Sequence, residues 1–263
     1  MRTYRIILCV LAITLSVAAA YSAFMYVYTD HMFAPVAFLT TPKTQAPHTP
    51  WPTLQKQTRF IHQVNTPQRA QRKGKRFAGL EVDVWGEELL AAHDEQEALL
   101  QTPLRAIFAA VKNPQEKLWW LDLKSEFSAA ALDAMVQTAA QYNIPPENLL
   151  FETVPGPTAK LINQKKLALL LQLPEGFETD QNDLKRREEI NAQTWALWEE
   201  YRPAAVSASF GKYGHLKTYF PDMPKAIYYS NTKRPSLKKS FMAAHIKKDP
   251  SVKIFMTDEY TYL

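Results

Sequence analysis

The stretch that decides the fold is Gly79–Trp85, with the sequence GLEVDVW. As a β-strand it alternates, so Glu81 and Asp83 share one face while the leucine and the two valines share the other. Two carboxylates on an inward face repel each other, and burying an unpaired ion costs several kcal/mol. The stretch therefore predicts either an edge strand with a solvated acidic face or a buried strand whose acids bind a cation.

Outward from this stretch, short β-rich runs alternate with helical patterns. Eight strands alternating with helices predict a (β/α)8 TIM barrel. A doubly wound open sheet is the alternative, but it usually carries a glycine-rich phosphate loop after its first strand, and this chain has only 7 glycines. The predicted strands span residues 60–64, 79–85, 118–124, 149–153, 167–173, 205–210, 226–231 and 252–258, and the predicted helices span residues 66–76, 103–112, 128–142, 158–166, 188–201, 215–219 and 236–248.

Ionisable residues gather at the ends of the first three predicted strands. In a (β/α)8 barrel the chemistry lies where the strands end, at the C-terminal face. Asp122 and Lys124 lie two residues apart on the third strand, so they share a face as the two acids of the second strand do. Taken singly, each residue has a structural explanation, such as a packed histidine or a salt bridge at the rim. The six residues that together predict a rim site are His62, Glu81, Asp83, His93, Asp122 and Lys124.

The chemistry of this set is that of phosphodiester cleavage. Three carboxylates without a thiol predict an oxygen-ligand site for a hard cation, Mg²⁺ or Ca²⁺, rather than for zinc. The single cysteine, Cys9, lies in an apolar segment far from these residues in the sequence. Two histidines suit a general acid and a general base, because the ordinary histidine pKa of about 6.5 lets one be neutral and the other protonated near pH 7. Lys124 suits neutralisation of charge on phosphoryl oxygens.

Four motifs follow one another in the chain: His62–Asn65 (HQVN), Gly79–Asp83 (GLEVD), His93 and Leu121–Lys124 (LDLK). In this order they resemble the PLC-like barrel phosphodiesterases, which include glycerophosphodiester phosphodiesterases, sphingomyelinase D-type phospholipases and the menorin family. The first and last motifs look most like the sphingomyelinase D branch. The ending Ile254–Asp258 (IFMTD) looks like the final strand of the glycerophosphodiesterases.

The resemblance implies a role for each motif residue. Glycerophosphodiesterases usually follow the first histidine with Arg-Gly, whereas here Gln63-Val64 stands, so a phosphate-binding arginine is missing. This difference bears on the substrate more than on the chemistry, and it leaves open whether the product is a hydrolysed or a cyclic phosphate. The implied roles are catalysis for His62, His93 and Lys124, metal binding for Glu81, Asp83 and Asp122, and substrate support for Asn65.

The later predicted strands also end in polar residues. We expect these residues to shape the substrate pocket, with ordinary loop polarity as an equally good explanation for each one. The residues are Glu152, Gln172, Ser209, Tyr229, Asn231, Lys233 and Arg234, of which Glu152, Tyr229 and Asn231 are the predicted substrate-binding residues.

The N-terminus predicts a membrane anchor. Arg2 and Arg5 precede residues 6–28, which carry no charge and exceed the roughly 20 residues that cross a bilayer core. The apolar run continues past a possible cleavage site at Ala18–Ala20, so residues 1–30 are predicted to form an uncleaved, single-pass signal anchor. The positive-inside rule then places the rest beyond the inner membrane, in the periplasm.

Two further segments follow the anchor. Residues 31–55 are rich in proline and predict an extended linker, and residues 56–263 predict the barrel domain. The formal net charge is +5, and basic residues concentrate between Lys56 and Arg76. They predict a solvated helix face or contact with anionic lipid headgroups, while an outward-facing anchor excludes nucleic acid as a partner.

These observations predict a membrane-anchored, divalent-metal-dependent phosphodiesterase of lipid metabolism. Its substrate would be a phospholipid or a glycerophosphodiester-type compound at the outer face of the inner membrane. The alternative is a catalytically silent barrel that serves as a lipid- or protein-binding envelope module. The missing arginine and the tethered arrangement motivate this alternative.

Overall fold

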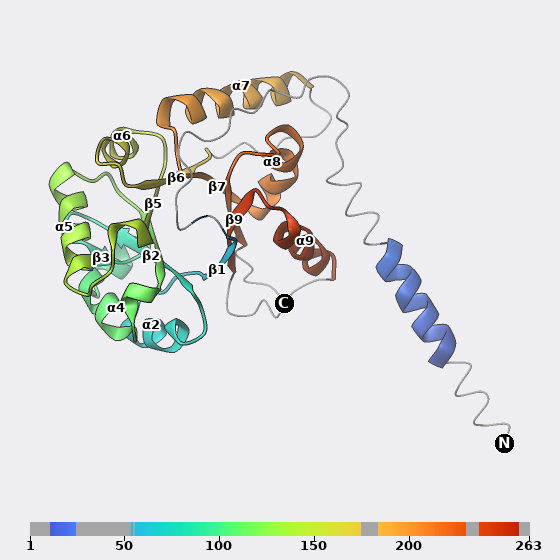
Figure 1. Ribbon diagram of the computed structural model, residues 1–263, viewed down its shortest axis with the longest axis horizontal. Coiled ribbons are helices and arrows are strands. Elements are labelled where there is room, and N and C mark those ends of the chain that lie inside the picture. Colours follow the sequence, from blue (N-terminus) through green and yellow to red (C-terminus); the bar gives the residue numbers. More distant parts are fainter. Residues whose placement is uncertain (1–10, 25–53, 55, 175–183, 230–236, 258–263) are drawn as a thin grey trace.

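The computed structural model of the chain describes residues 11–24, 54, 56–174, 184–229 and 237–257 (Figure 1). Its parallel strands are β1 (Thr58–Ile61), β2 (Gly79–Trp85), β4 (Leu118–Leu123), β5 (Leu149–Thr153), β6 (Ala168–Gln172), β7 (Ala205–Ser209), β8 (Lys225–Tyr229) and β9 (Val252–Thr257). They pair in the order β1-β9-β8-β7-β6-β5-β4-β2, and pairing of β1 with β2 closes the sheet. The predicted (β/α)8 barrel is confirmed, and the open doubly wound sheet is excluded.

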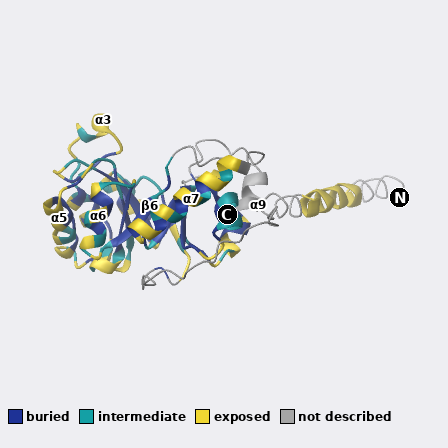
Figure 2. Ribbon diagram, turned by 90° about the horizontal axis from the view of Figure 1, so that it is seen from above, coloured by how far each residue is buried: buried dark blue, intermediate teal, exposed yellow. Residues whose placement is uncertain are grey.

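Helices connect the strands and cover the outside of the barrel. Figure 2 shows buried strands at the centre and exposed residues along the outer faces of the helices. The N-terminus of the first of these helices is capped by Thr66, whose side chain accepts the Arg69 N–H. Pro67 follows in the first turn of this helix, where backbone N–H groups have no partner within the helix, so its missing N–H costs no hydrogen bond. The helices are α2 (Pro67–Gly74), α4 (Leu104–Ala110), α5 (Ala129–Ala140), α6 (Pro157–Gln164), α7 (Leu184–Tyr201), α8 (Tyr213–Tyr219) and α9 (Leu237–Lys248), with 3-10 turns η2 (Pro114–Glu116), η3 (Pro146–Asn148) and η4 (Phe210–Lys212).

One excursion was not predicted from the sequence. Between β2 and α4 the chain forms β3 (Leu90–Ala91), which pairs antiparallel with the end of β2, and the short helix α3 (Glu95–Ala98). The Asp94 side chain caps α3 by accepting the Glu97 N–H. Figure 2 shows α3 standing out from the barrel with exposed residues. The excursion carries His93 back toward the rim.

Apolar residues fill both sides of the sheet. Leu80 and Val82 pack outward, between the sheet and the helices, together with most of the large buried residues. Phe60, Trp120 and Leu150 belong to a separate cluster inside the barrel. The sheet is therefore buried on both faces, as parallel sheets usually are. The acids of β2 lie on the inner face of the sheet, the same face as this interior apolar cluster.

The seam between β1 and β2 closes the barrel. It consists of two residue pairs, Phe60 with Gly79 and Ile61 with Leu80. A Cβ atom on Gly79 would lie 2.3 Å from the Phe60 ring, so only glycine leaves room for this ring inside the barrel. Closure therefore depends on the pairing of a large residue with the smallest one.

A buried lysine ties the chain together at the N-terminal end of the barrel. Lys225, the first residue of β8, is fully buried. Its ammonium donates to the carbonyls of Phe220 at 2.7 Å and Met223 at 2.8 Å, and to Ser251 Oγ at 2.7 Å. It also donates to the Pro221 carbonyl at 3.1 Å. Burial lowers the pKa of Lys225 to about 8. These bonds join the α8–β8 connection to the α9–β9 connection.

The predicted N-terminal segments lie largely outside the described residues. Residues 11–24 are helical and exposed. Within the described ranges, no helix is both long enough and apolar enough to cross a membrane. The anchor over residues 1–30 and the linker over residues 31–55 remain predictions.

Candidate active site

The acids of β2 and β4 point into the barrel at its C-terminal end. Pairing in register places Asp83 beside Asp122. The neighbouring Val82 and Leu121 belong to the outer apolar layer, so the strand period turns the acids inward. The prediction that the acids of both strands share one face is confirmed.

Three carboxylates form the centre of this site. One oxygen each from Glu81, Asp83 and Asp122 lies within 4.8 Å of the others. Glu81 and Asp83 are fully buried. Burial, followed by the charges of Asp83 and Asp122, raises the pKa of Glu81 well above its ordinary value. Burial also raises the pKa of Asp122.

Lys124 lies between two of these acids. Its Nζ is 2.5 Å from Asp122 Oδ2 and 3.0 Å from Asp83 Oδ1. Burial would lower the pKa of Lys124, but the two carboxylates outweigh burial and raise it well above the ordinary value. In return, burial would raise the pKa of Asp83, but Lys124 and the Asn65 hydrogen bond outweigh it and lower that pKa. Of the three acids, Asp83 is the one whose pKa the surroundings lower, so its charged form is the one they favour.

The cluster fits a divalent cation with oxygen ligands. Glu81 Oε1 is buried and has no hydrogen-bond partner within the described part of the chain. Such an orphaned carboxylate oxygen is costly unless a cation or a proton satisfies it. Three hard carboxylate donors in reach of one point match the ligand preference of Mg²⁺, Ca²⁺ or a similar cation. Glu81, Asp83 and Asp122 are the residues that would hold it.

Both predicted histidines lie beside this cluster. His62 Nε2 is 4.0 Å from Glu81 Oε2, and the His62 side chain is 20% exposed. His93 Nδ1 is 3.2 Å from Asp83 Oδ1, and the His93 side chain is 48% exposed. Glu97 of α3 accepts the His93 backbone N–H at 2.9 Å and so fixes the excursion at this point. The two histidines approach different acids of one cluster.

The turn after β1 is held by the acids it faces. Gln63 has a φ of 54°, an uncommon conformation for a residue with a side chain. Its backbone N–H donates to Glu81 Oε2. Asn65 Nδ2 donates to Asp83 Oδ2 at 2.7 Å, and Asn65 Oδ1 accepts the Asp83 N–H at 3.0 Å. Gln63 thus contributes a backbone donor directly after the first histidine.

Arg69 is a supporting residue that the sequence did not point to. It lies on α2, within a basic stretch predicted as a solvated face or a lipid contact. Its Nη2 donates to the His62 carbonyl at 3.0 Å. The arginine therefore holds the backbone of the first histidine. The one sequence feature that relates to this contact is its place in the first turn of the helix that follows that histidine.

Glu152 lies inside the barrel, next to Asp122 on the adjoining strand. Its Oε2 accepts the Trp120 indole N–H at 2.7 Å. Burial, followed by the charge of Asp122, raises the pKa of Glu152 to about 8. At neutral pH it is therefore mostly protonated, and it adds a fourth acidic group beneath the cluster.

The prediction for Tyr229 needs correction. Tyr229 is buried in the outer apolar layer, with its ring centroid 4.8 Å from that of Phe210. Tyr228 faces the interior instead, where its hydroxyl pairs with the side-chain amide of Gln172. The reason is that β8 alternates, so that Ala226 and Tyr228 face the interior while Ile227 and Tyr229 face the helices. Asn231, Lys233 and Arg234 lie outside the described residues.

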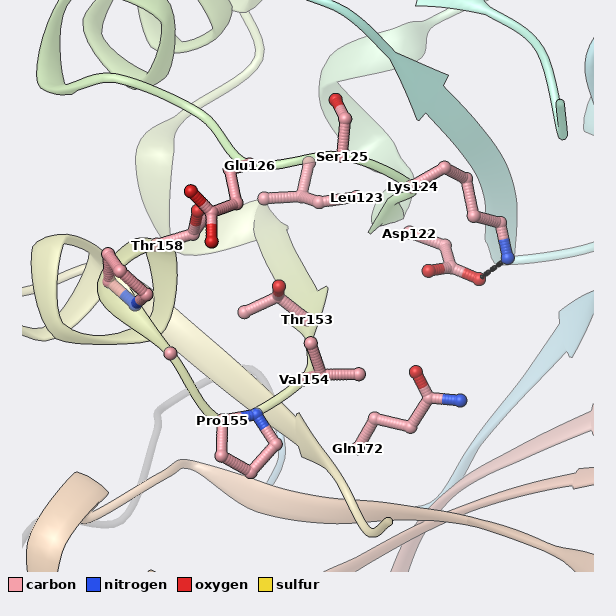
Figure 3. Close-up of a pocket in the computed structure, with 12 residues that line it drawn as sticks. Asp122, Leu123, Lys124, Ser125, Glu126, Thr153, Val154, Pro155, Thr158 and Gln172 are labelled. Carbon is pink, nitrogen blue, oxygen red and sulfur yellow. Dashed lines mark hydrogen bonds and ion pairs between the residues drawn. The ribbon is translucent and has the colours of Figure 1, made fainter. Parts of the chain in front are cut away.

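A cavity of about 390 Å³ opens beside the cluster (Figure 3). It lies where β4, β5 and β6 end and where α6 begins. The Asp122–Lys124 pair forms one edge, and Gln172 faces it from β6. A molecule held between the histidines and the three acids would extend into this space.

Comparisons with known proteins identify the fold. No protein-family model matches the chain, and no curated protein matches its sequence. The chain is similar to the solved structure of N-(5'-phosphoribosyl)anthranilate isomerase from Pyrococcus furiosus, with 9% identity, a TM-score of 0.51, and coverage of 79% of this chain and 90% of that one. It is also similar to a glycerophosphodiester phosphodiesterase from Parabacteroides distasonis ATCC 8503, with 12% identity, a TM-score of 0.51, and coverage of 78% and 94%. At these identities the likeness shows that the chain folds as a TIM barrel.

Proposed function

We propose that this protein is a divalent-metal-dependent phosphodiesterase of the PLC-like barrel type. One observation carries the proposal: two histidines, at 4.0 Å and 3.2 Å, approach different acids of a single buried cluster of three carboxylates. The shared fold with a glycerophosphodiester phosphodiesterase supports it, as does the order of the sequence motifs. The substrate would be a phospholipid or a glycerophosphodiester-type compound.

The histidines would move the protons of the reaction. Asp83 lies beside His93 Nδ1 and so favours a proton on that nitrogen, which leaves Nε2 to accept one from the attacking hydroxyl. Asp83 also stabilises the charged imidazolium that results. His62 would donate a proton to the leaving oxygen, and its backbone is fixed on both sides by Arg69 and by the turn at Gln63.

The remaining groups of the site would stabilise charge. A bound Mg²⁺ or Ca²⁺ would polarise a phosphoryl oxygen as a Lewis acid. Lys124 would place a fixed positive charge near the same oxygens, in a site partly closed to water. Asn65 would keep Asp83 in its orientation through two hydrogen bonds.

The location of the protein is part of the same proposal. The uncharged residues 6–28 behind Arg2 and Arg5 favour a single-pass anchor in the inner membrane with the barrel in the periplasm. There the barrel would meet phospholipid substrate at the membrane surface. Nucleic acid is not an expected partner.

The test is turnover of bis-p-nitrophenyl phosphate and of a lysophospholipid by the full chain in detergent, with Mg²⁺ and after chelation. We expect His62→Ala and His93→Ala each to lower kcat by roughly 10²- to 10⁴-fold, since each removes a proton-transfer group. His48→Ala, in the predicted linker, is the matched control and should not change the rate. Unchanged turnover in both rim variants, or in the chelated enzyme, would contradict the proposal.

A second candidate has an observation of its own. The Lys124 ammonium already contacts both Asp83 and Asp122 and offsets part of their charge, as a cation supplied by the chain itself. This favours a catalytically silent barrel that binds a lipid or a protein of the envelope. Calorimetric titration with Mg²⁺ and Ca²⁺ distinguishes the two. Binding of either ion supports the enzyme, whereas no binding together with no turnover supports the silent module.

A further inference from the structure

The cavity beside the acid cluster has a lining with a definite chemistry. Its volume of about 390 Å³ is at the small end for ligand pockets, so it suits a headgroup rather than an acyl chain. Hydrogen-bonding side chains alternate around it with short apolar ones. The polar groups of the lining are Asp122, Lys124, Ser125, Glu126, Thr153, Thr158 and Gln172.

Glu126 is the one charged group of this lining that is not tied to another part of the site. Asp122 and Lys124 pair with each other at 2.5 Å. Glu126 has no hydrogen bond or ion pair anywhere in the part of the chain that the structure describes. Figure 3 shows Glu126, Thr153 and Gln172 around one opening, with the Asp122–Lys124 pair at its edge. Glu126 is also exposed, so the cavity offers an unpaired negative charge at its solvent-facing edge.

The two charged ends of the cavity match a zwitterion. Lys124 lies on the side of the proposed phosphate position, and Glu126 follows two residues later, with its carboxylate on the opposite side of the opening (Figure 3). A phosphate near Lys124 and a cation near Glu126 would each meet the opposite charge. A second anionic group in this cavity would instead meet Glu126, and no arginine is among the described residues that line it.

The same lining distinguishes between two kinds of ammonium group. A quaternary ammonium, as in choline, is recognised by aromatic rings, and none is among the described lining residues. A primary ammonium carries three N–H donors and needs oxygen acceptors. The Glu126 carboxylate and the Thr153 hydroxyl supply such acceptors in this lining, whereas Gln172 lies across the opening, on the side of the Asp122–Lys124 pair.

We infer that this cavity binds a headgroup with a primary ammonium, of the aminoethanol type, and that Glu126 selects it. The inference rests on the proposed function, because it assigns the substrate class of that same site. Glu126 acts in specificity: it holds the far end of the substrate, and the histidines act on the phosphodiester.

The test measures binding and turnover separately, with the full chain and Mg²⁺. Binding of O-phosphoethanolamine, phosphocholine and glycerol 2-phosphate is measured by calorimetry, and kcat/KM is measured on the three matching lysophospholipids. We expect about tenfold or more preference for the aminoethanol compound in both measurements, the size of a hydrogen-bonded charge pair. Glu126→Gln should abolish the preference with little change for the choline compound. Glu199→Gln, at an exposed position on α7, is the matched control and should keep it.

Each outcome separates this inference from the proposed function. Turnover with equal kcat/KM for all three headgroups, or with a preference unchanged in Glu126→Gln, overturns the inference and leaves the phosphodiesterase standing. Preferential binding of O-phosphoethanolamine that is lost in Glu126→Gln, but without turnover, supports the inference and overturns the enzyme. No binding of any of the three compounds overturns the inference as well.

Discussion

The two ends of the barrel each contain a buried or partly buried lysine, and the two lysines have opposite surroundings. At the C-terminal mouth, Lys124 touches the carboxylates of Asp83 and Asp122, which raise its pKa. At the N-terminal end, Lys225 touches backbone carbonyls and Ser251, and burial lowers its pKa to about 8. The same side chain therefore neutralises charge at one end and joins chain segments at the other.

This difference explains where chemistry and stability lie in the fold. Carboxylates can exchange a lysine partner for a metal ion or a phosphoryl group, because both interactions are electrostatic and the mouth is open to a cavity. The backbone carbonyls around the fully buried Lys225 have no such alternative partner. The mouth is thus expected to govern turnover and the closed end to govern unfolding, in line with the usual division of labour in TIM barrels.

Removing the mouth lysine should give the largest effect. Lys124→Met takes away the fixed positive charge at the phosphoryl position, so we expect kcat to fall by about 10²- to 10³-fold. It also leaves Asp83 buried without its cation, so the metal-free variant should lose about 3 kcal/mol of stability. Mg²⁺ should restore much of this stability, as measured by urea unfolding with and without chelator. Full turnover in the variant would place Lys124 outside the chemistry.

Removing the lysine at the closed end should affect stability alone. Lys225→Met leaves three or more buried acceptors without a donor, and we expect a loss of about 3 kcal/mol in the free energy of unfolding. The kcat/KM of the folded variant should equal that of the wild type. Lys253→Met is the control, because its lysine is half-buried and, among the described residues, bonds to the nearby Pro250 carbonyl alone. A drop in kcat/KM at unchanged stability would reverse the assignment of the two ends.

A smaller effect concerns the acid beneath the cluster. The folded-state pKa of Glu152 is about 8, raised from the ordinary glutamate value of 4.5, so the folded protein holds an extra proton between these two pH values. Its contribution to stability is complete below pH 4.5 and is lost as pH rises through 8, at about 1.4 kcal/mol per pH unit. Glu152→Gln mimics the protonated form and should flatten this slope in the chelated protein, measured by urea unfolding at pH 6, 7 and 8. If the free energy of unfolding changed equally with pH in the wild type and in Glu152→Gln, Glu152 would be ionised over this whole pH range.

Much of the fold follows from patterns that are visible in single strands. The alternation of Glu81 and Asp83 with apolar residues fixed both the extent of β2 and the face that its acids take. Strand β8 was harder, because a buried lysine at its start looks like a loop residue and two adjacent tyrosines carry no alternation. The β3–α3 excursion was missed because a two-residue strand and a four-residue helix are too short to show a periodic pattern of apolar residues.

The candidate site divides in the same way. His62 and Asp122 were found because their strands end at a known face of a barrel, which is a consequence of topology. Glu126 and Arg69 were not found, because their contributions depend on what lies opposite them in space. The bridge that Lys124 makes to Asp83 also needed coordinates, since residues on neighbouring strands have no fixed spacing in the sequence.

The β1–β2 seam described above has a consequence for how the protein would fail. Its ladder has two residue pairs, and beyond them the Val64 N–H donates to the Glu81 carbonyl at 2.8 Å. Thermal breathing at this joint would separate the turn after β1 from Glu81 and Asp83 while the longer ladders elsewhere stay intact. Heat should therefore inactivate the protein below its melting temperature. In Gly79→Ala the added methyl group would press against the Phe60 ring and keep the seam open at all temperatures, with the same loss of activity.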